Sequence, residues 1–558
     1  MSIVPVIWLS YHDGVDARGP WDTGILERLF RNELWPTDYT FEHTVFHPPA
    51  MVYPEMMGAP RAIVVLPARH HCHPADIARL NKDLANLQSV LLILCGDEEG
   101  AFPWKDIQHP NIRFWVQMPD PKHYADMAHF GFFFGNGFAD GRTPAASPAK
   151  SVSWAFMGQH TNSRRKAAVK GLTKLSRRLT GVLVETSGFA QGLDRDDYLS
   201  QLENAWVAPC PSGPKHVDTF RLYEALEAGC IPVVDGATPE GPMPYWEFAY
   251  GDVPFPVVHD WESVGGIVEH LYERRHHCSA MCSAWWQQQK RIIGQQLVRD
   301  LQALGFGPAL ERLPLTAIVT TSPTAAGASL GNIITTIVSV RETFGDIEII
   351  VACDGVRPEQ EHLRVGYEQF VYELCRWTES GVCGPIVPWY DGVWRHQAMT
   401  TFNAITQLGT EPVLLFMEHD APLTTDEPID FEGCVDLVAR GHLDVIRFHH
   451  ESHILPPHEH LMIDRHTIEM AGVPLRRTIQ WSQRPHLAGA GYYLGVLGDN
   501  FTNASRCFIE DKMHSVVQVA RPGRHRLAIY HPPGGNIKRS YHLDGRGDEP
   551  KLDDRQVF

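Results

Sequence analysis

Short runs of consecutive apolar residues recur along the chain, each bounded by proline, glycine or charged residues. In the first half they cover residues 63–66, 90–94 and 231–234, and a stretch with helical periodicity lies at residues 75–87. Strands that are apolar throughout are typical of parallel sheets with helices on both faces. The pattern therefore predicts an α/β fold for the first half.

The second half repeats this alternation after a break. Residues 261–304 predict a long helix that ends in a Gly-Phe-Gly-Pro segment, and strands are expected afterwards at residues 315–321 and 347–352. A chain of 558 residues also exceeds what one hydrophobic core usually supports. We therefore expect two domains. Their predicted bounds are residues 1–309, in lobes of about 1–145 and 146–309, and residues 310–558.

A further apolar run, residues 413–417, leads into Glu418, His419 and Asp420. Side chains of a strand alternate, so Glu418 and Asp420 point to the same side and can offer oxygen atoms to one Mg²⁺ or Mn²⁺ ion. Ligands of open α/β sheets collect at the carboxyl ends of the strands. The run therefore predicts a metal site, and the alternative is a strand that ends in a solvated acidic turn.

The composition is that of a folded globular protein, with 44% hydrophobic and 21% charged residues. The net charge of −17 disfavours binding to nucleic acid or to an anionic membrane. The eleven cysteines lack paired spacing, and neither a signal peptide nor a run long enough to span a membrane is recognisable. We therefore expect a cytoplasmic protein without a transmembrane segment.

Polar residues follow the first two strands of the second half as well. Thr321 and Pro323 close the first strand, and Asp354 and Arg357 follow the second. Together with the acidic pair, this order resembles the GT-A fold of family-2-like inverting glycosyltransferases over about residues 314–520. The resemblance implies that Thr321 and Pro323 flank the nucleobase of a nucleotide sugar. It also implies that Asp354 hydrogen-bonds the base and that Arg357 adds to the site.

The same resemblance implies a metal shell and a catalytic base. Asp420 is the expected main ligand of Mn²⁺ or Mg²⁺, and His542 is expected to complete the shell. Glu418 replaces the family's first aspartate, so direct coordination, a ribose contact and a water-mediated contact stay open. Glu510 or Asp511 is the expected base, with Asp511 preferred, because inversion needs a carboxylate that takes the acceptor proton. Alternatively, the two acids only stabilise a helix N-terminus.

Histidines gather after the acidic strand, where zinc is the obvious alternative ligand. The members of this group are His449, His450, His453, His458 and His460. Two prolines at residues 456–457 break any helix that would align them, so a loop lining an acceptor groove is preferred. Residues 476–486 mix arginine, glutamine and tryptophan, which suits an acceptor. Lys538 and Arg539 are expected to close over a leaving diphosphate, unless the tail is merely flexible.

In the first half, a Gly/Pro-rich loop at residues 209–213 precedes a helix and then a buried strand. Free amides at a helix N-terminus suit phosphate. The order resembles exostosin-like glycosyltransferases of the GT-B fold, which generally need no catalytic metal. The resemblance implies that Arg221 contacts the diphosphate and Glu224 the ribose or base, with Gly158 and Arg164 at the same site. Alternatively, Arg221 and Glu224 only pair with each other.

The opposite lobe is expected to supply the acceptor site and the base of this second transfer. His12, Asp13 and Asp22 follow its first strand, and the choice among them stays open. Residues 70–73 are rich in histidine, but neighbours in a row cannot all reach one ion, so a solvated loop is preferred over a metal site.

These patterns favour a bifunctional glycosyltransferase that uses nucleotide-sugar donors, with a UDP-sugar expected first, and a glycan or other hydroxyl acceptor. Glycosylation of modified bases in phage-type DNA is an alternative that the net charge does not favour. A single active domain beside an acceptor-binding scaffold is another. A binding protein with degenerate transferase folds and a zinc hydrolase are the alternatives from other classes.

Overall fold

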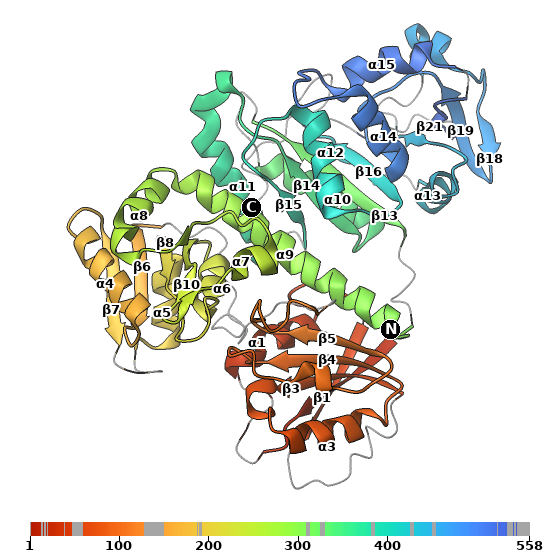
Figure 1. Cartoon of the computed structure of the whole chain (residues 1–558). Helices are drawn as coiled ribbons and strands as arrows, with labels where there is room; N and C mark the ends of the chain where they lie inside the picture. The colour runs from red at the N-terminus through yellow and green to blue at the C-terminus, as the bar shows by residue number, and fades with distance from the viewer. Residues whose placement is uncertain are drawn as a thin grey trace. The chain divides into compact units, whose positions relative to one another are not determined.

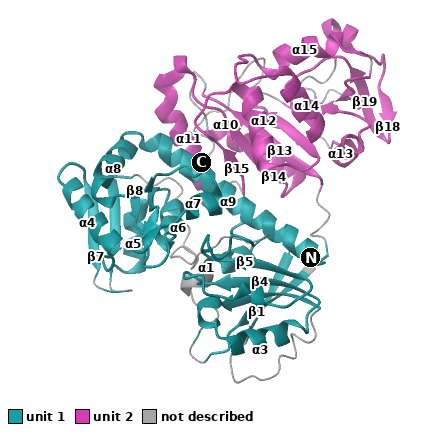
Figure 2. Cartoon of the chain, viewed as in Figure 1, with its two compact units in different colours: residues 1–311 teal, residues 312–558 magenta. Residues whose placement is uncertain are grey.

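The computed structural model describes most of the chain, with gaps. The described residues are 2–12, 15, 18, 20–37, 39–46, 60–127, 150–186, 188, 192–307, 313–323, 330–380, 385–424, 429–448, 454–521, 523–532, 540 and 543. They divide into two compact units, Met1–Glu311 and Arg312–Phe558 (Figure 2). The sequence prediction put this boundary two residues earlier.

Several predicted site residues lie outside the described part of the chain. They are Asp13, His449, His450, His453, Lys538, Arg539 and His542. The side chain of Asp22 is likewise not described.

The first lobe of unit 1 is built on a five-stranded parallel sheet with the order β2-β1-β3-β4-β5. The strands are β1 (Ser2–Leu9), β2 (Tyr39–Phe46), β3 (Arg61–Pro67), β4 (Ser89–Cys95) and β5 (Ile112–Val116). The helices are α1 (Pro20–Phe30) and α3 (Pro74–Leu84), with 3₁₀ turns η1 (Ala68–His70) and η2 (Trp104–Asp106). The chain order reverses between β1 and β3, and such a switch point opens a crevice at the carboxyl ends of the strands.

The second lobe of unit 1 has its own five-stranded parallel sheet, with the order β12-β9-β8-β6-β7. The strands are β6 (Val152–Gln159), β7 (Gly181–Thr186), β8 (Ala205–Cys210), β9 (Ile231–Asp235) and β12 (Val257–Val258), and the small hairpin is β10 (Ala237–Thr238) and β11 (Gly241–Pro242). The helices are α4 (Ser163–Leu175), α5 (Arg195–Glu203), α6 (Phe220–Glu227), α7 (Tyr245–Tyr250) and α8 (Val264–Glu273), with the 3₁₀ turn η4 (Trp261–Ser263).

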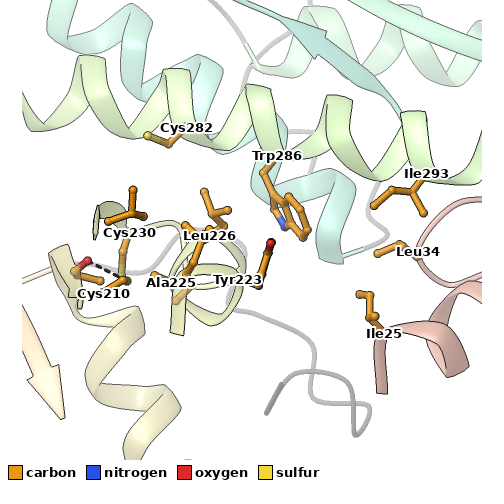
Figure 3. Close-up of a cluster of buried hydrophobic side chains, with 14 of the residues drawn as sticks. Ile25, Leu34, Cys210, Tyr223, Ala225, Leu226, Cys230, Cys282, Trp286 and Ile293 are labelled. Atoms are coloured by element: carbon orange, nitrogen blue, oxygen red, sulfur yellow. Dashed lines mark hydrogen bonds between the residues drawn. The ribbon is translucent and has the colours of Figure 1, made fainter. Parts of the chain in front are cut away.

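The helix α9 (Arg275–Ala303) runs as one long element and packs against both lobes (Figure 1). Asp300 accepts hydrogen bonds from Arg113 and Trp115 of the first lobe, whereas Trp286 donates to Glu227 of the second. Figure 3 shows the core between them, where Trp286 lies against Tyr223 with 5.8 Å between ring centroids. The predicted helix at residues 261–304 is therefore three elements, η4, α8 and α9.

Unit 2 contains a nine-stranded sheet with the order β15-β14-β13-β16-β20-β17-β21-β19-β18. The strands are β13 (Leu315–Thr321), β14 (Glu348–Cys353), β15 (Val387–Trp389), β16 (Val413–Glu418), β17 (Val445–Arg447), β18 (Ile468–Met470), β19 (Val473–Thr478), β20 (His486–Gly489) and β21 (Leu527–Tyr530). The alternation of strands and helices in the second half predicts a mostly parallel sheet, as in the GT-A fold that it resembles. The sheet is instead mixed, because β20 runs antiparallel to both β16 and β17.

Helices pack beside this sheet (Figure 1). They are α10 (Leu330–Phe344), α11 (Arg364–Ser380), α12 (His396–Leu408), α13 (Phe431–Ala439), α14 (Ala490–Asn500) and α15 (Ile509–Val519), with 3₁₀ turns η5 (Pro358–Leu363) and η6 (Pro456–Leu461). The α/β class and the strands expected from apolar runs are confirmed. No helix among the described residues is both long and apolar enough to cross a bilayer.

Candidate active sites of the two units

A cavity of 490 Å³ in unit 2 opens at the edge where the parallel strands β13, β14 and β16 end. Predicted residues from four separate segments line it: Thr321, Asp354, Arg357, Glu418, Asp420, Glu510 and Asp511. Pro323 is buried and does not line the cavity. The strand register accounts for the convergence, because Thr320 pairs with both Glu418 and Ala352 across the sheet.

Asp354 is fixed by backbone and side-chain donors. Its Oδ1 atom accepts hydrogen bonds from the backbone N–H groups of Gly355 and Arg395, both at 2.9 Å, and from the Thr400 hydroxyl at 2.7 Å. Burial raises the pKa of Asp354, and these donors oppose the rise. The carboxylate is therefore held in one orientation at the cavity wall.

Glu418 lies in an environment that disfavours its charge. Burial, and then the charge of Asp420, raise the pKa of Glu418 to about 7, while a hydrogen bond from Gln397 Nε2 at 3.0 Å opposes the rise. Gln397 also accepts a hydrogen bond from Gln483, so an amide chain holds the Glu418 carboxyl. Two close carboxyl groups that repel each other are a typical setting for a cation.

Glu510 and Asp511 stand in the first turn of α15, and both line the cavity. Glu510 Oε2 accepts a hydrogen bond from the Gln483 backbone N–H at 3.2 Å, and Asp511 is exposed. Asp511 is thus the more accessible of the two carboxylates.

A divalent cation fits this donor set, since Mg²⁺ and Mn²⁺ are often held by one or two carboxylates together with phosphate oxygens. Within the described residues, no group of three or more histidine, cysteine, aspartate or glutamate side chains is placed to hold a metal ion by itself. Of the described histidines of this group, His458 in η6 lines the cavity and His460 is not among its lining residues.

The cavity lining also includes residues that the sequence did not single out. They are His396 and Gln397 at the start of α12 and Arg447 at the end of β17. Gln480, Ser482 and Arg484, from the stretch predicted to suit an acceptor, also line it. His396 has a backbone φ of 66°, which a non-glycine residue adopts rarely. In the sequence, the signal for His396 and Gln397 was their position as polar residues at the start of a largely apolar helix.

In unit 1, Gly158 and Arg221, which the sequence analysis assigns to one site, are neighbours. Arg221 Nη2 donates a hydrogen bond to the Met157 carbonyl at 2.6 Å, and the guanidinium lies 4.7 Å from the centroid of the Phe156 ring. A Cβ atom at residue 158 would come within 2.2 Å of Arg221 Nη2. Glycine at this position therefore makes room for the guanidinium.

The two neighbouring arginines of α4 have different surroundings. Arg164 pairs with buried Asp235, with an Nη2 to Oδ1 distance of 2.5 Å, and donates to the His259 carbonyl. Arg165 instead donates from Nε to the Ser212 carbonyl at 3.1 Å. Burial, and then the charge of Arg221, lower the pKa of Arg165 to about 10. Arg165 and not Arg164 thus lies beside Arg221, because Asp235 engages the guanidinium of Arg164.

The loop before α6 and the first turn of this helix carry buried polar atoms. Within the described residues, Ser212 Oγ, Thr219 Oγ1 and Arg221 Nε are buried without a hydrogen-bond partner. Buried polar groups are seldom left unsatisfied, so such a group of atoms suggests a ligand or ordered water. Glu224 accepts a hydrogen bond from the Tyr198 hydroxyl at 2.6 Å. Two close guanidinium groups at a helix N-terminus suit an anion.

No family model and no curated protein sequence matches this chain. Among solved structures, a DNA-modifying β-glucosyltransferase is 12% identical with a TM-score of 0.32, and the match covers 55% of this chain and 99% of that one. GalNAc-T7 with UDP, GalNAc and Mn²⁺ is 9% identical with a TM-score of 0.28, covering 43% and 45%. TarS of S. aureus is 10% identical with a TM-score of 0.26, covering 44% and 42%.

This chain therefore spans less than half of the GalNAc-T7 and TarS chains. At TM-scores this low, the function has to be argued from the geometry of the two sites.

Proposed function

We propose that this chain is a nucleotide-sugar glycosyltransferase with two transfer sites, a metal-dependent site of GT-A type in unit 2 and a metal-independent site of GT-B type in unit 1. The observation that carries the proposal is the convergence of acids from three separate segments on one cavity at the carboxyl edge of parallel strands. Ligands of open α/β sheets bind at this edge.

In unit 2, Thr321, Asp354 and Arg357 would hold the nucleoside of the donor. Asp354 is suited to this role because its three hydrogen-bond donors fix its orientation. Asp420 and Glu418 would hold Mn²⁺ or Mg²⁺, which supplies positive charge to the donor diphosphate and favours its departure. The resemblance also gives this role to His542, which lies outside the described residues.

Asp511 is proposed as the catalytic base of unit 2, with Glu510 as a neighbour held by Gln483. Its carboxylate takes the proton of the acceptor hydroxyl as the acceptor oxygen bonds to the anomeric carbon of the sugar. The bond from that carbon to the diphosphate oxygen breaks at the same time. Attack opposite the leaving group inverts the configuration of the anomeric carbon.

In unit 1, Arg221 and Arg165 are proposed to hold the donor diphosphate at the N-terminus of α6. Their guanidinium groups supply the positive charge that the cation supplies in unit 2. Glu224 would contact the ribose or base, and Gly158 leaves room for Arg221. We assign Arg164 to structural support of the lobe, because its guanidinium pairs with Asp235.

The donors are proposed to be nucleotide sugars, with UDP-sugars tested first, and the acceptor a glycan or other hydroxyl compound. The experiment screens the purified chain with a panel of UDP-, GDP-, dTDP- and CMP-sugars, with and without Mn²⁺. Release of nucleotide is measured for the parent and for the Asp420→Asn and Arg221→Ala variants. We expect each variant to lose a different activity. Unchanged turnover in both variants would falsify the assignment, and loss in only one would leave a single active unit.

A further inference from the structure

His12 stands at the switch point of the first lobe. It follows β1, whose neighbour β3 leads into His71. The rings of His12 and His71 lie 4.9 Å apart. At a switch point of this kind, ligands of open α/β sheets bind in the crevice at the carboxyl ends of the two strands, here β1 and β3. The expectation of a solvated loop at residues 70–73 was wrong for His71, which is buried.

The His12 ring is held by a carboxylate. Its Nε2 atom lies 3.0 Å from Asp76 Oδ2, in the first turn of α3. The Asp76 side chain is 14% exposed, and the His12 side chain is 43% exposed. An accessible imidazole oriented by a largely buried carboxylate is the arrangement used for proton transfer by histidine.

His71 fixes the position of this pair but does not take part in proton transfer. Its Nδ1 atom donates to the Pro67 carbonyl at 2.8 Å, and its Nε2 atom accepts from the Tyr11 backbone N–H at 2.9 Å. Both ring nitrogens are therefore engaged, and burial lowers the pKa of His71. A neutral, fixed imidazole beside His12 holds the loop after β1 in place.

The carboxyl edge of the first lobe faces the arginine site of the second. Glu98, after β4, lies close enough to Arg165 and Asp218 to influence their pKa values. Asp120, after β5, is likewise close enough to His216 for its charge to raise the pKa of that imidazole. Parallel strands end at one edge, so His12 belongs to the edge that faces the arginine pair.

We infer that His12 is the general base of the transfer site in unit 1, and that Asp76 is its positioning residue. The inference rests on the proposed function of that site. The acceptor oxygen bonds to the anomeric carbon, the bond from that carbon to the diphosphate oxygen breaks, and the diphosphate leaves with the electron pair. The acceptor proton moves to Nδ1 of His12, and Asp76 balances the resulting imidazolium charge. The proposed base and the proposed diphosphate site thus belong to different lobes of unit 1.

The test uses the full chain with Asp420→Asn, so that only unit 1 turns over donor. The probe is whichever sugar nucleotide of the panel this parent hydrolyses in an Arg221-dependent manner. We expect His12→Ala to lower kcat about 10²- to 10⁴-fold, the usual contribution of a general base. UDP affinity, measured by calorimetry, should stay within about twofold. Added imidazole should restore part of the rate, which a purely structural loss would not allow.

His70→Ala is the matched control, since His70 is exposed at the same edge of the sheet, and it should keep the parent rate. Asp76→Asn should lower kcat less than His12→Ala does, again with unchanged UDP affinity. Full activity of His12→Ala, or a loss of UDP binding in that variant without imidazole rescue, would overturn the inference. If Arg221→Ala also leaves turnover and UDP binding intact, or no donor is hydrolysed, the proposed function of unit 1 itself fails.

Discussion

The candidate sites of the two units differ in the sign of the charge that they gather. Unit 2 places Glu418 and Asp420 together and raises the pKa of Glu418 to about 7. Unit 1 places Arg165 and Arg221 together and lowers the pKa of Arg165 to about 10. In each cluster, burial and a neighbouring like charge disfavour the charged form of the side chain, and a bound ion of opposite charge would stabilise it. Under the proposed function, the acidic cluster would hold a cation between protein and diphosphate, whereas the arginine cluster would bind the diphosphate directly.

The largest expected effect tests the acidic site. Asp420→Asn should lower Mn²⁺-dependent donor turnover by about 10²- to 10³-fold, the scale of losing one preorganised electrostatic contact at a reaction centre. Metal-independent turnover should be unchanged. The measurement is nucleotide release with and without Mn²⁺. Asp499→Asn, an exposed acid of unit 2, is the control and should behave as the parent. Equal Mn²⁺ dependence in parent and Asp420→Asn would remove the contrast between the units.

The second effect tests the arginine site. Arg221→Ala should weaken UDP binding at unit 1 by about 10- to 100-fold, because a hydrogen bond to a charged group contributes about 1.5–3 kcal/mol. Calorimetry without metal reports this site alone if unit 2 requires a cation. Arg177→Ala, an exposed arginine of the same lobe, is the control. UDP affinity equal to that of the control would show that the arginine pair does not hold the nucleotide.

A third effect separates the two neighbouring arginines. Arg164→Ala should lower the free energy of unfolding of unit 1 by about 2 kcal/mol, because the buried Asp235 carboxylate loses its positively charged partner and keeps only neutral hydrogen-bond donors such as Trp261. Arg165→Ala should lower UDP affinity with a smaller change in unfolding. Urea unfolding and calorimetry on the same samples measure both quantities. The reverse outcome, with ligand binding lost in Arg164→Ala and stability lost in Arg165→Ala, would restore the assignment made from the sequence.

The smallest effect concerns Asp218, before α6. Burial raises its pKa to about 7, although hydroxyls of Tyr223 and Tyr245 donate to it. A raised folded pKa means that the native state holds the proton more tightly than the unfolded chain. The stabilisation contributed by protonated Asp218 is therefore complete below pH 4 and is lost as the pH rises through about 7. Between pH 6 and 8, unit 1 should lose about 1 kcal/mol.

Asp218→Asn should remove this dependence, and urea midpoints at pH 6 and 8 measure it. A decline of the same size in the variant would assign the dependence to other groups. No matching decline is expected from Arg165, whose pKa lies above this range.

The fold was largely predictable because apolar runs report buried strands directly. The predicted runs at residues 63–66, 90–94 and 413–417 all lie within parallel strands. The break of the predicted long helix at Arg274 and the antiparallel β20 were missed. Both depend on packing between segments distant in the chain, which local periodicity does not contain.

The predicted residues that follow a strand directly are the ones whose positions the sequence predicted most accurately. Glu418 and Asp420 follow a strand whose alternation and register place them, so they lie at the cavity. Gln397 was missed because its role is to link Glu418 with Gln483, and no spacing in the sequence indicates that contact. Arg164 was chosen over Arg165 because both follow the same strand and only Asp235 distinguishes them.

By itself, the sequence determined the α/β class, the acidic strand end and the loop that precedes α6, because each depends on residues close together in the chain. Only the tertiary structure decided which side chains share a site. It brought Asp354 and Asp511 to one cavity, set Arg165 beside Arg221, and paired His12 with Asp76. Those pairings depend on strand order and register, which are fixed by burial of the whole sheet and not by any one segment.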